Sequence, residues 1–386
     1  MRKLKYIGLL IILSCVNLFA QAIVYINPQT INITNDTTAI VEIKIAGVTD
    51  LKTYRVSLSF NDSIVEFSEV TRKEFLRSGG ASGSTFLTQP STLNIINNFS
   101  VDETLKPEFS GGILTASGSG TLFSVEFDIL EAGFTEISID EVKLYDLSGQ
   151  YMSVEFYSGS ITVMLPVKAK VFFEGPFSVD KMNTVLNQNG HLPNSQPYSV
   201  SPWNYSGSES VPLNFFASNP NIVDWVLLEL RTGILPSTRV AEQACFVLND
   251  GSLVGLDGSA APYFEQATND YYIVITHRNH LSIMNALPYP ISKTSAEYDF
   301  TDSQSKAYGS GAMTEVATGV FAMYAADANS DGNITGTDFN IFNPDFRSAA
   351  SGYLNTDFNL DGSVTGTDFN LFNPNFRSAR SSNVPK

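Results

Sequence analysis

The feature that most constrains the fold of this 386-residue chain is an acidic segment that occurs twice near its C-terminal end. The first copy, Asp327–Asp338, reads DANSDGNITGTD, and the second, Asp357–Asp368, reads DFNLDGSVTGTD. In both copies, oxygen-bearing side chains stand at positions 1, 3, 5, 7, 9 and 12, and a glycine stands at position 6, where the backbone of a calcium loop turns sharply. The sequence therefore predicts two calcium ions, one in each loop.

The side chains at these positions carry the oxygen ligands that a hard cation prefers, and position 7 adds its backbone carbonyl. A single segment of this kind has a simpler interpretation as an acidic surface turn, because Asp, Asn and Gly favour turns. Two complete matches in register favour a metal site instead. The predicted ligands are Asp327, Asn329, Asp331, Asn333, Thr335 and Asp338 in the first loop and Asp357, Asn359, Asp361, Ser363, Thr365 and Asp368 in the second.

A loop followed by a helix, in duplicate, resembles a dockerin module, and the resemblance covers residues 327–377. It implies a partner protein that carries a cohesin. Pro344 and Pro374 depart from the dockerin pattern, because a residue before proline avoids the helical region, so we expect each helix to stop after about two turns. Shortened helices put the usual docking surface in doubt. Aromatic residues at helical spacing predict a core shared by the two copies: Phe339, Phe342, Phe346, Phe369, Phe372 and Phe376.

Residues 23–165 alternate apolar and polar side chains, as in 41–45, 54–60 and 123–129. Half-buried antiparallel strands have this pattern, which predicts two sheets packed face to face. The order of the phrases INPQTINIT, VEIKIAGVTDLKTYRVSLSFNDSIVEFSEV and GTLFSVEFDILEAGFTEISIDEVKLYDLSG resembles a cohesin domain. The resemblance implies a nine-stranded sandwich that binds dockerins in extracellular polysaccharide-degrading assemblies. Another secreted β-sandwich is the alternative.

A docking face is predicted on this first domain. In the segment TLNIINNF, a regular strand turns Asn94, Ile96 and Asn98 outward. With Thr115 and Ser117 of a neighbouring run, they predict a flat polar face around one apolar anchor. Residues 23–165 contain no tryptophan, so sugar stacking is the weaker interpretation.

Residues 167–325 predict a second β-rich domain, with strands in VDWVLLELR and DYYIVITHRNHLSIM and a short helix in KMNTVLNQNG. Several phrases resemble a recurrent module of secreted multidomain bacterial proteins, from which no mechanism follows. No catalytic residues stand out. The segment His277–His280 suggests zinc but lacks a third nearby ligand, so polar side chains that fix a loop are favoured. Trp203 lies in a Pro-rich loop and could stack on a sugar, although attachment of the loop to its own domain is favoured.

The first 22 residues predict a secretory signal peptide, because Arg2, Lys3 and Lys5 precede an apolar run and small residues follow it. Cys15 ends a stretch that resembles a lipoprotein processing site, which leaves a lipid anchor as an alternative. No later segment is apolar and long enough to span a membrane. Cys245 is then the only cysteine, and we expect it to be a small buried hydrophobe.

The predicted organisation is mainly β: a cohesin-like domain at 23–165, a β-rich domain at 167–325 and a small helical dockerin-like module at 327–386. A net charge of −16 excludes nucleic acid as a partner. The leading hypothesis is a secreted, non-catalytic scaffold or adaptor that links other cohesin- or dockerin-bearing extracellular proteins of a polysaccharide-handling bacterium. The alternative is a sugar-binding protein or an enzyme of the glycoside hydrolase type, with the activity in the middle domain.

Overall fold

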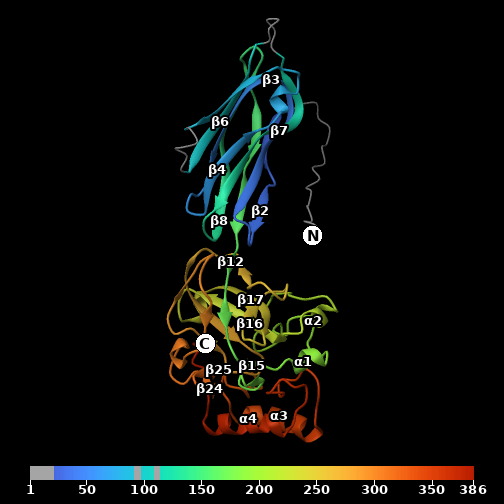
Figure 1. The fold of residues 1–386 in the computed structure, drawn as a ribbon, viewed down its shortest axis with the longest axis vertical. Helices are drawn as coiled ribbons and strands as arrows, with labels where there is room; N and C mark the ends of the chain where they lie inside the picture. The colour runs from blue at the N-terminus through green and yellow to red at the C-terminus, as the bar shows by residue number, and fades with distance from the viewer. Residues whose placement is uncertain (1–20, 91–96, 108–113) are drawn as a thin grey trace. The chain divides into compact units, whose positions relative to one another are not determined.

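The structure is a computed structural model that describes residues 21–90, 97–107 and 114–386. These residues form two compact units (Figure 1). Unit 1 contains the described residues up to Thr162, apart from the short segment Glu131–Phe134, which groups with Val163–Lys386 in unit 2. The chain is mainly β, as predicted. Nearly all of the predicted signal peptide, including Cys15, lies outside the described residues.

Unit 1 contains eleven strands in its described residues, and they join into one hydrogen-bonded sheet. The resemblance to cohesins implies nine strands, and the higher count includes short strands such as β9, which has two residues. The strands are β1 (Ala22–Asn27), β2 (Thr30–Ile33), β3 (Thr38–Ser59), β4 (Val65–Arg72), β5 (Ser84–Gln89), β6 (Asn98–Leu105), β7 (Ala116–Ile129), β8 (Gly133–Asp146), β9 (Tyr151–Met152), β10 (Val154–Tyr157) and β11 (Gly159–Val163).

The 22-residue strand β3 belongs to both layers of this unit. Its first half lies between β1 and β7, and Ile43 pairs with residues of both. Its second half lies between β6 and β8, and Val56 pairs with residues of both. Between the halves the register with β7 shifts, and Gly47 and Asp50 adopt positive φ angles of 71° and 55°. This bulged bend carries one strand from the first layer into the second.

The core of unit 1 lies between the two layers that β3 joins. Phe67 of β4 packs edge-to-face on Phe99 of β6, with ring centroids 5.0 Å apart. Tyr54, in the second half of β3, stacks on Phe123 of β7 at 6.1 Å. These rings confirm the predicted face-to-face packing, and the segments predicted as strands at 41–45 and 54–60 are the two halves of β3.

Unit 2 is built around a six-stranded sheet in the order β18-β17-β16-β20-β21, with β22 also paired to β20. Every residue of the central strand β16 is buried. The strands of unit 2 are β12 (Leu165–Pro166), β13 (Ala169–Lys170), β14 (Phe177–Ser178), β15 (Lys181–Met182), β16 (Ile222–Arg231), β17 (Arg239–Leu248), β18 (Leu253–Val254), β19 (Tyr263–Phe264), β20 (Asn269–Thr276), β21 (Ile283–Met284), β22 (Tyr289–Ile291), β23 (Tyr298–Asp299), β24 (Thr314–Ala317) and β25 (Val320–Ala322).

Four α-helices accompany this sheet in the described residues: α1 (Val185–Gln188), α2 (Phe215–Ser218), α3 (Gly336–Ser348) and α4 (Gly366–Arg377). The predicted strands in VDWVLLELR and DYYIVIT correspond to β16 and β20, and the predicted short helix to α1. Leu360 of the second duplicated loop belongs to the same hydrophobic cluster as Trp225 of β16. The segments 167–325 and 327–386 therefore pack together within one unit.

The helices α3 and α4 run through Pro344 and Pro374, so the prediction that they stop after about two turns is wrong. Each proline removes one hydrogen bond to the carbonyl four residues earlier, but Asn340 and Asn370 are exposed, so water can take that place. Beyond the prolines, aromatic rings stack on the preceding turn at 5.3 Å in α3 and 5.2 Å in α4. This stacking stabilises the last turn of each helix.

Candidate metal centre

The N-terminal ends of α3 and α4 position the last two predicted ligands of each loop. Thr335 caps α3, and its backbone N–H donates to Oδ2 of Asp338 at 2.8 Å. Thr365 and Asp368 make the same contact at the start of α4, also at 2.8 Å. Both aspartates are fully buried. Each capping box therefore fixes a carboxylate of position 12 at the inner side of its loop.

The first loop, residues 327–338, curls around its own side chains. The N–H of Gly332 donates to Oδ2 of Asp327 at 2.9 Å, and the N–H of Asp331 donates to Oδ1 of Asn329 at 3.0 Å. The N–H of Asn333 donates to Oδ1 of Asp331 at 2.9 Å. Gly332 has a φ of 78°, a conformation that favours glycine. Backbone donors thus hold the side chains of positions 1, 3 and 5 within one loop.

The second loop, residues 357–368, repeats this arrangement. Gly362 donates to Oδ2 of Asp357 at 2.8 Å, Asp361 to Oδ1 of Asn359 at 3.1 Å, and Ser363 to Oδ1 of Asp361 at 2.9 Å. The two copies therefore share a local conformation as well as a sequence.

The donors of the first loop fit a hard cation. Oδ1 of Asp327 is buried and has no hydrogen-bond partner in the part of the chain that the structure describes. Burial, together with neighbouring carboxylates, raises the pKa of Asp327 to about 7, and burial raises that of Asp357 to about 7. A buried carboxylate oxygen without a partner is costly, and a cation bound among these oxygens would compensate for it.

The predicted calcium ligands in each loop include amide and backbone carbonyl oxygens as well as carboxylates. Within the described ranges, no three His, Cys, Asp or Glu side chains group closely enough to hold a metal ion. A loop of this type also uses amide and backbone carbonyl oxygens. The two calcium ions therefore stay a prediction that rests on each loop as a whole, including Asn329, Asn333, Asn359 and Ser363.

The second loop packs closely against the rest of unit 2. Nδ2 of Asn279 donates to the carbonyl of Asp357 at 2.7 Å, and Nδ2 of Asn183 donates to the carbonyl of Asn359 at 3.1 Å. A Cβ at Gly175 would overlap the carbonyl oxygen of Phe358. The backbone of this loop is thus held by residues that lie outside the duplicated segment.

The first loop is more exposed, although residues outside it also hold its backbone: the N–H of Ser382 donates to the carbonyl of Gly332, and the N–H of Ile334 donates to the carbonyl of Arg380, both at 2.9 Å. Oγ of Ser330 donates to the carbonyl of Arg278 at 2.6 Å, and the N–H of Asp327 donates to the carbonyl of Asn279 at 3.2 Å. Asp331 and Asn333 are exposed, whereas the matching Asp361 and Ser363 of the second loop are half-buried.

Asp224 of β16 lies at the centre of a buried polar network. Its Oδ2 accepts from Nε of Arg278 at 3.0 Å and lies 3.1 Å from Nε2 of His277, and its Oδ1 accepts from the hydroxyl of Tyr353 at 2.7 Å. Burial by itself raises the pKa of Asp224, but Arg278 and His277 outweigh burial and hold the pKa below its usual value. Arg278 also donates to the carbonyl of Leu354. The network therefore anchors the approach to the second loop.

This network is the functional feature that sequence reasoning missed. Asp224 and Tyr353 are 129 residues apart in the chain, and neither belongs to a recognisable motif. The only signal was the charged segment His277–His280 after an apolar strand, which was correctly expected to fix a loop.

The zinc interpretation of His277–His280 does not hold within the described residues. Nδ1 of His277 and Nδ1 of His280 lie 3.0 Å apart and bond to each other, and Nδ1 of His280 is 2.8 Å from Oδ1 of Asn279. Both imidazoles pack on Phe173, and burial lowers the pKa of both. They are neutral structural side chains.

The aromatic residues of the Pro-rich loop mainly attach it to its own unit, as expected. Tyr198 is buried, and its hydroxyl donates to the carbonyl of Trp225 at 2.8 Å. Trp203 packs edge-to-face on Tyr198 at 5.1 Å but keeps part of its surface exposed.

The predicted docking face on unit 1 is only partly described. Asn94 and Ile96 lie outside the described residues. Asn98 is exposed and opposes Ser59 of β3. Thr115 and Ser117 both hydrogen-bond to Asp50, at 3.2 and 2.9 Å. Because Asp50 and Ser59 are nine residues apart on β3, roughly 30 Å along an extended strand, Asn98 does not lie beside Thr115 and Ser117.

Cys245 and the helices bear on two further predictions. Cys245 is fully buried, and burial raises the pKa of its thiol far above the usual value, so it acts as a small apolar side chain. Among the helices of the described residues, none has the length and apolar character needed to cross a membrane.

No protein-family model and no curated protein matches the chain. Solved cohesin domains are similar to part of it. A non-cellulosomal cohesin from the archaeon Archaeoglobus fulgidus is 19% identical, with 37% of this chain and 91% of that chain covered and a TM-score of 0.29. The seventh ScaB type I cohesin of Pseudobacteroides cellulosolvens is 18% identical, with 37% and 92% covered and a TM-score of 0.30. A type I cohesin–dockerin complex from Clostridium thermocellum gives 12% identity, 37% and 99% coverage and a TM-score of 0.30.

Proposed function

We propose that this protein is a secreted, non-catalytic adaptor that joins extracellular proteins through a cohesin-like sandwich and a calcium-organised, dockerin-like module. The sequence resemblances of residues 23–165 and 327–377 support this proposal, as do the two preformed loops. Its setting would be a bacterial surface or secreted assembly that handles polysaccharides.

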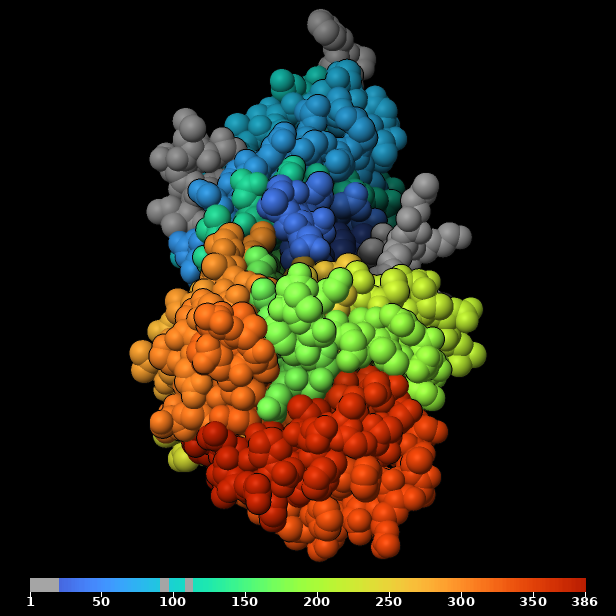
Figure 2. Space-filling model, turned by 60° about the horizontal axis from the view of Figure 1, so that its bottom comes forward, coloured from blue at the N-terminus to red at the C-terminus, as the bar shows by residue number. Residues whose placement is uncertain are grey.

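The observation that carries the proposal is a repeated aromatic surface on α3 and α4, which pack against each other through Phe339 and Phe372 at 5.7 Å (Figure 1). The C-terminal residues that include both helices, red in Figure 2, gather on one face of unit 2. Of the six aromatic residues predicted to form a shared core, only Phe342 and Phe372 are buried. The rings at the edges of this core stay between 37% and 40% exposed: Phe339, Phe346, Phe369 and Phe376. A groove of about 750 Å³ lies between the helices. Aromatic rings at a groove are typical anchors of protein interfaces.

The full length of α3 and α4 removes the doubt about the docking surface that shortened helices would raise. Since α3 and α4 extend past Pro344 and Pro374, the surface of each helix is not shortened. Phe346 and Phe376 lie on the turns that were predicted to be missing, so they extend the aromatic surface along both helices.

Calcium binding is tested by isothermal titration calorimetry of the full chain with Asp331→Ala and Asp361→Ala. Each substitution removes the oxygen ligand at position 5 of one loop, so we expect two sites in the native chain, one in each single variant and none in the double variant. The melting temperature in chelator should be lower than in calcium, because metal that binds only the folded state stabilises it. Unchanged calcium binding by the double variant would contradict the assignment.

Docking is tested with the full chain against a panel of purified cohesin domains and dockerin modules, in calcium and in chelator. We expect calcium-dependent binding to a cohesin that is lost in a Phe339→Ser, Phe369→Ser double variant, since both rings border the groove. The matched control is Ile341→Ser, an exposed apolar residue of α3 that does not line the groove. If no panel member binds and the full chain does not self-associate in sedimentation at high concentration, the adaptor proposal fails.

A further inference from the structure

The central sheet of unit 2 forms the floor of a cavity of about 470 Å³. Glu229 of β16 opposes Glu242 of β17 on one side and Val274 of β20 on the other. Leu227 opposes Thr276 in the next row, and both also line the cavity. The floor is thus a continuous patch of three neighbouring strands, which makes it rigid.

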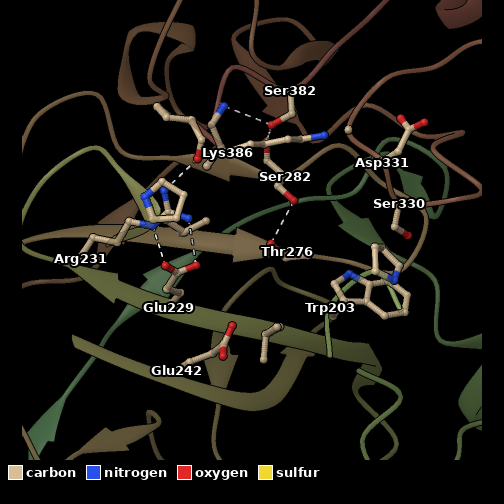
Figure 3. Close-up of a pocket in the computed structure, with 17 residues that line it drawn as sticks. Trp203, Glu229, Arg231, Glu242, Thr276, Ser282, Ser330, Asp331, Ser382 and Lys386 are labelled. Atoms are coloured by element: carbon tan, nitrogen blue, oxygen red, sulfur yellow. Dashed lines mark hydrogen bonds and ion pairs between the residues drawn. The ribbon is translucent and has the colours of Figure 1, made fainter. Parts of the chain in front are cut away.

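The walls come from three other parts of the unit. Trp203 of the Pro-rich loop lies near Ser330, across the cavity from Arg231 (Figure 3). Ser330, Asp331 and Gly332 of the first duplicated loop and the segment 382–386 complete the lining. Oγ of Ser382 donates to the carbonyl of Ser282 at 2.6 Å, which fixes that segment to the sheet.

The polar groups of the cavity favour a neutral ligand. Nε of Arg231 donates to Glu229 at 2.6 Å, so the one arginine of the lining is already paired, and Glu242 accepts from Nη1 of Arg239 at 2.9 Å. The other cation of the lining, Lys386, lies against Gly332 of the first loop and away from the floor. An anion such as phosphate would meet two carboxylates in the floor. The carboxylate oxygens remain able to accept further hydrogen bonds from hydroxyl groups.

Trp203 lines the cavity with a side chain that is only partly buried. Nε1 of Trp203 is buried and has no hydrogen-bond partner among the residues that the structure describes. The hydroxyls of Thr276 and Ser282, 3.0 Å apart, add groups that both donate and accept. An indole across the cavity from carboxylates matches a sugar ring, which offers apolar C–H groups on its face and polar O–H groups at its edge.

We propose that this cavity binds a neutral mono- or disaccharide, with Trp203 against the ring and with Glu229 and Glu242 accepting its hydroxyl groups. The volume lies within the usual range of small-ligand pockets. Because the first loop supplies part of the wall, calcium in that loop and sugar in the cavity stabilise each other. This coupling rests on the calcium sites proposed above, whereas the sugar site itself does not.

The test uses the intrinsic fluorescence of the full chain in calcium. The chain has two tryptophans, and Trp225 is fully buried with its Nε1 donating to the carbonyl of Pro193, so a change on titration reports Trp203. The probes are glucose, galactose, xylose, N-acetylglucosamine, cellobiose and xylobiose, each taken to the high millimolar range. We expect a saturable change with at least one of them, and no saturable change with any of the six overturns the proposal.

Variants locate the site, with calorimetry as the second readout. Trp203→Phe keeps an aromatic ring on Tyr198, and Glu242→Gln keeps the size of the side chain; each should weaken binding about tenfold or more. Glu265→Gln, at an exposed position outside the cavity, is the matched control and should bind as the native chain does. Equal binding by all three variants overturns the location.

The coupling is tested separately with Asp327→Ala, under conditions in which circular dichroism shows the native fold. Asp327 is the first ligand of the first loop and does not line the cavity, and the comparison is with Asp357→Ala, its counterpart in the second loop. We expect weaker sugar binding only in Asp327→Ala. Equal affinity in the two variants overturns the coupling and leaves the sugar site standing, so failure of the two ideas can be told apart.

Discussion

The two duplicated loops have the same ligand spacing and the same capped helices, yet their surroundings differ. Asn279 and Asn183 hold two backbone carbonyls of the second loop, and the backbone of Gly175 lies against a third. The first loop is held mainly by the C-terminal segment, through Ser382 and Arg380, and leaves Asp331 and Asn333 exposed. The difference teaches that a sequence repeat fixes local conformation, whereas the neighbouring elements decide how rigid each copy is.

We expect this difference to give the two loops different contributions to the stability of unit 2. The second loop is part of the packing of unit 2, so loss of its order costs contacts with the sheet. The first loop borders solvent and the cavity, so it can change with less cost. The following substitutions test this difference in stability between the loops, from the largest expected effect to the smallest.

Arg278→Met removes the buried guanidinium that pairs with Asp224 and leads into the second loop. An uncompensated buried charge typically costs about 3–5 kcal/mol, and we expect a loss of this size in the free energy of unfolding of unit 2, measured with denaturant. The control is Arg380→Met, because Arg380 stacks over Tyr324 at 4.7 Å as Arg278 does over Tyr353 at 4.2 Å, but is only half-buried. If the two variants lost the same free energy of unfolding, the network around Asp224 would not stabilise the unit more than the half-buried Arg380 does.

Gly175→Ala places a methyl group against the carbonyl of Phe358 in the second loop. Overpacking of this kind costs about 1–3 kcal/mol, and calcium affinity should fall at the second site only. Gly336→Ala, at the start of α3, meets nothing within 4 Å and is the control. A calorimetric titration in which the first site weakens as much as the second would refute the assignment of Gly175 to one loop.

Asn279→Ala leaves the carbonyl of Asp357 without its donor. An unsatisfied buried acceptor costs about 1–3 kcal/mol, whereas Ser330→Ala, which removes the side-chain contact of the first loop, should cost about 1 kcal/mol or less. Thermal unfolding of the two variants in calcium measures the difference. The idea of a more firmly held second loop does not survive if Ser330→Ala is the more damaging change.

Pro344→Ala and Pro374→Ala restore one helical hydrogen bond each and remove a restriction on the unfolded chain. These effects oppose each other, so we expect a net gain of about 2 kcal/mol, equal for the two sites. Circular dichroism and denaturant unfolding test this expectation. A clear loss at either site would show that the proline itself contributes to the packing of that helix.

The sequence predicted the strand pattern and both loops because those features depend on local spacing. Alternation identifies the halves of β3, and the Asp, Asn and Gly positions identify the loops. The same local reasoning gave a wrong prediction for the helix ends at Pro344 and Pro374, because it did not include the aromatic stacking beyond the prolines. The contacts of Asp224 with Arg278 and Tyr353 join distant segments, so no pattern along the chain reveals them.

The shared strand β3 has a mechanical consequence. The sheet order β1-β3-β8-β11 connects the first strand of unit 1 to the last strand through β3. Tension applied across these strands enters the first half of β3 through its ladder with β1 and leaves the second half through its ladder with β8. The covalent backbone of β3 carries this force between the two layers. The layers therefore separate only if the ladder with β1 or the ladder with β8 breaks as a whole.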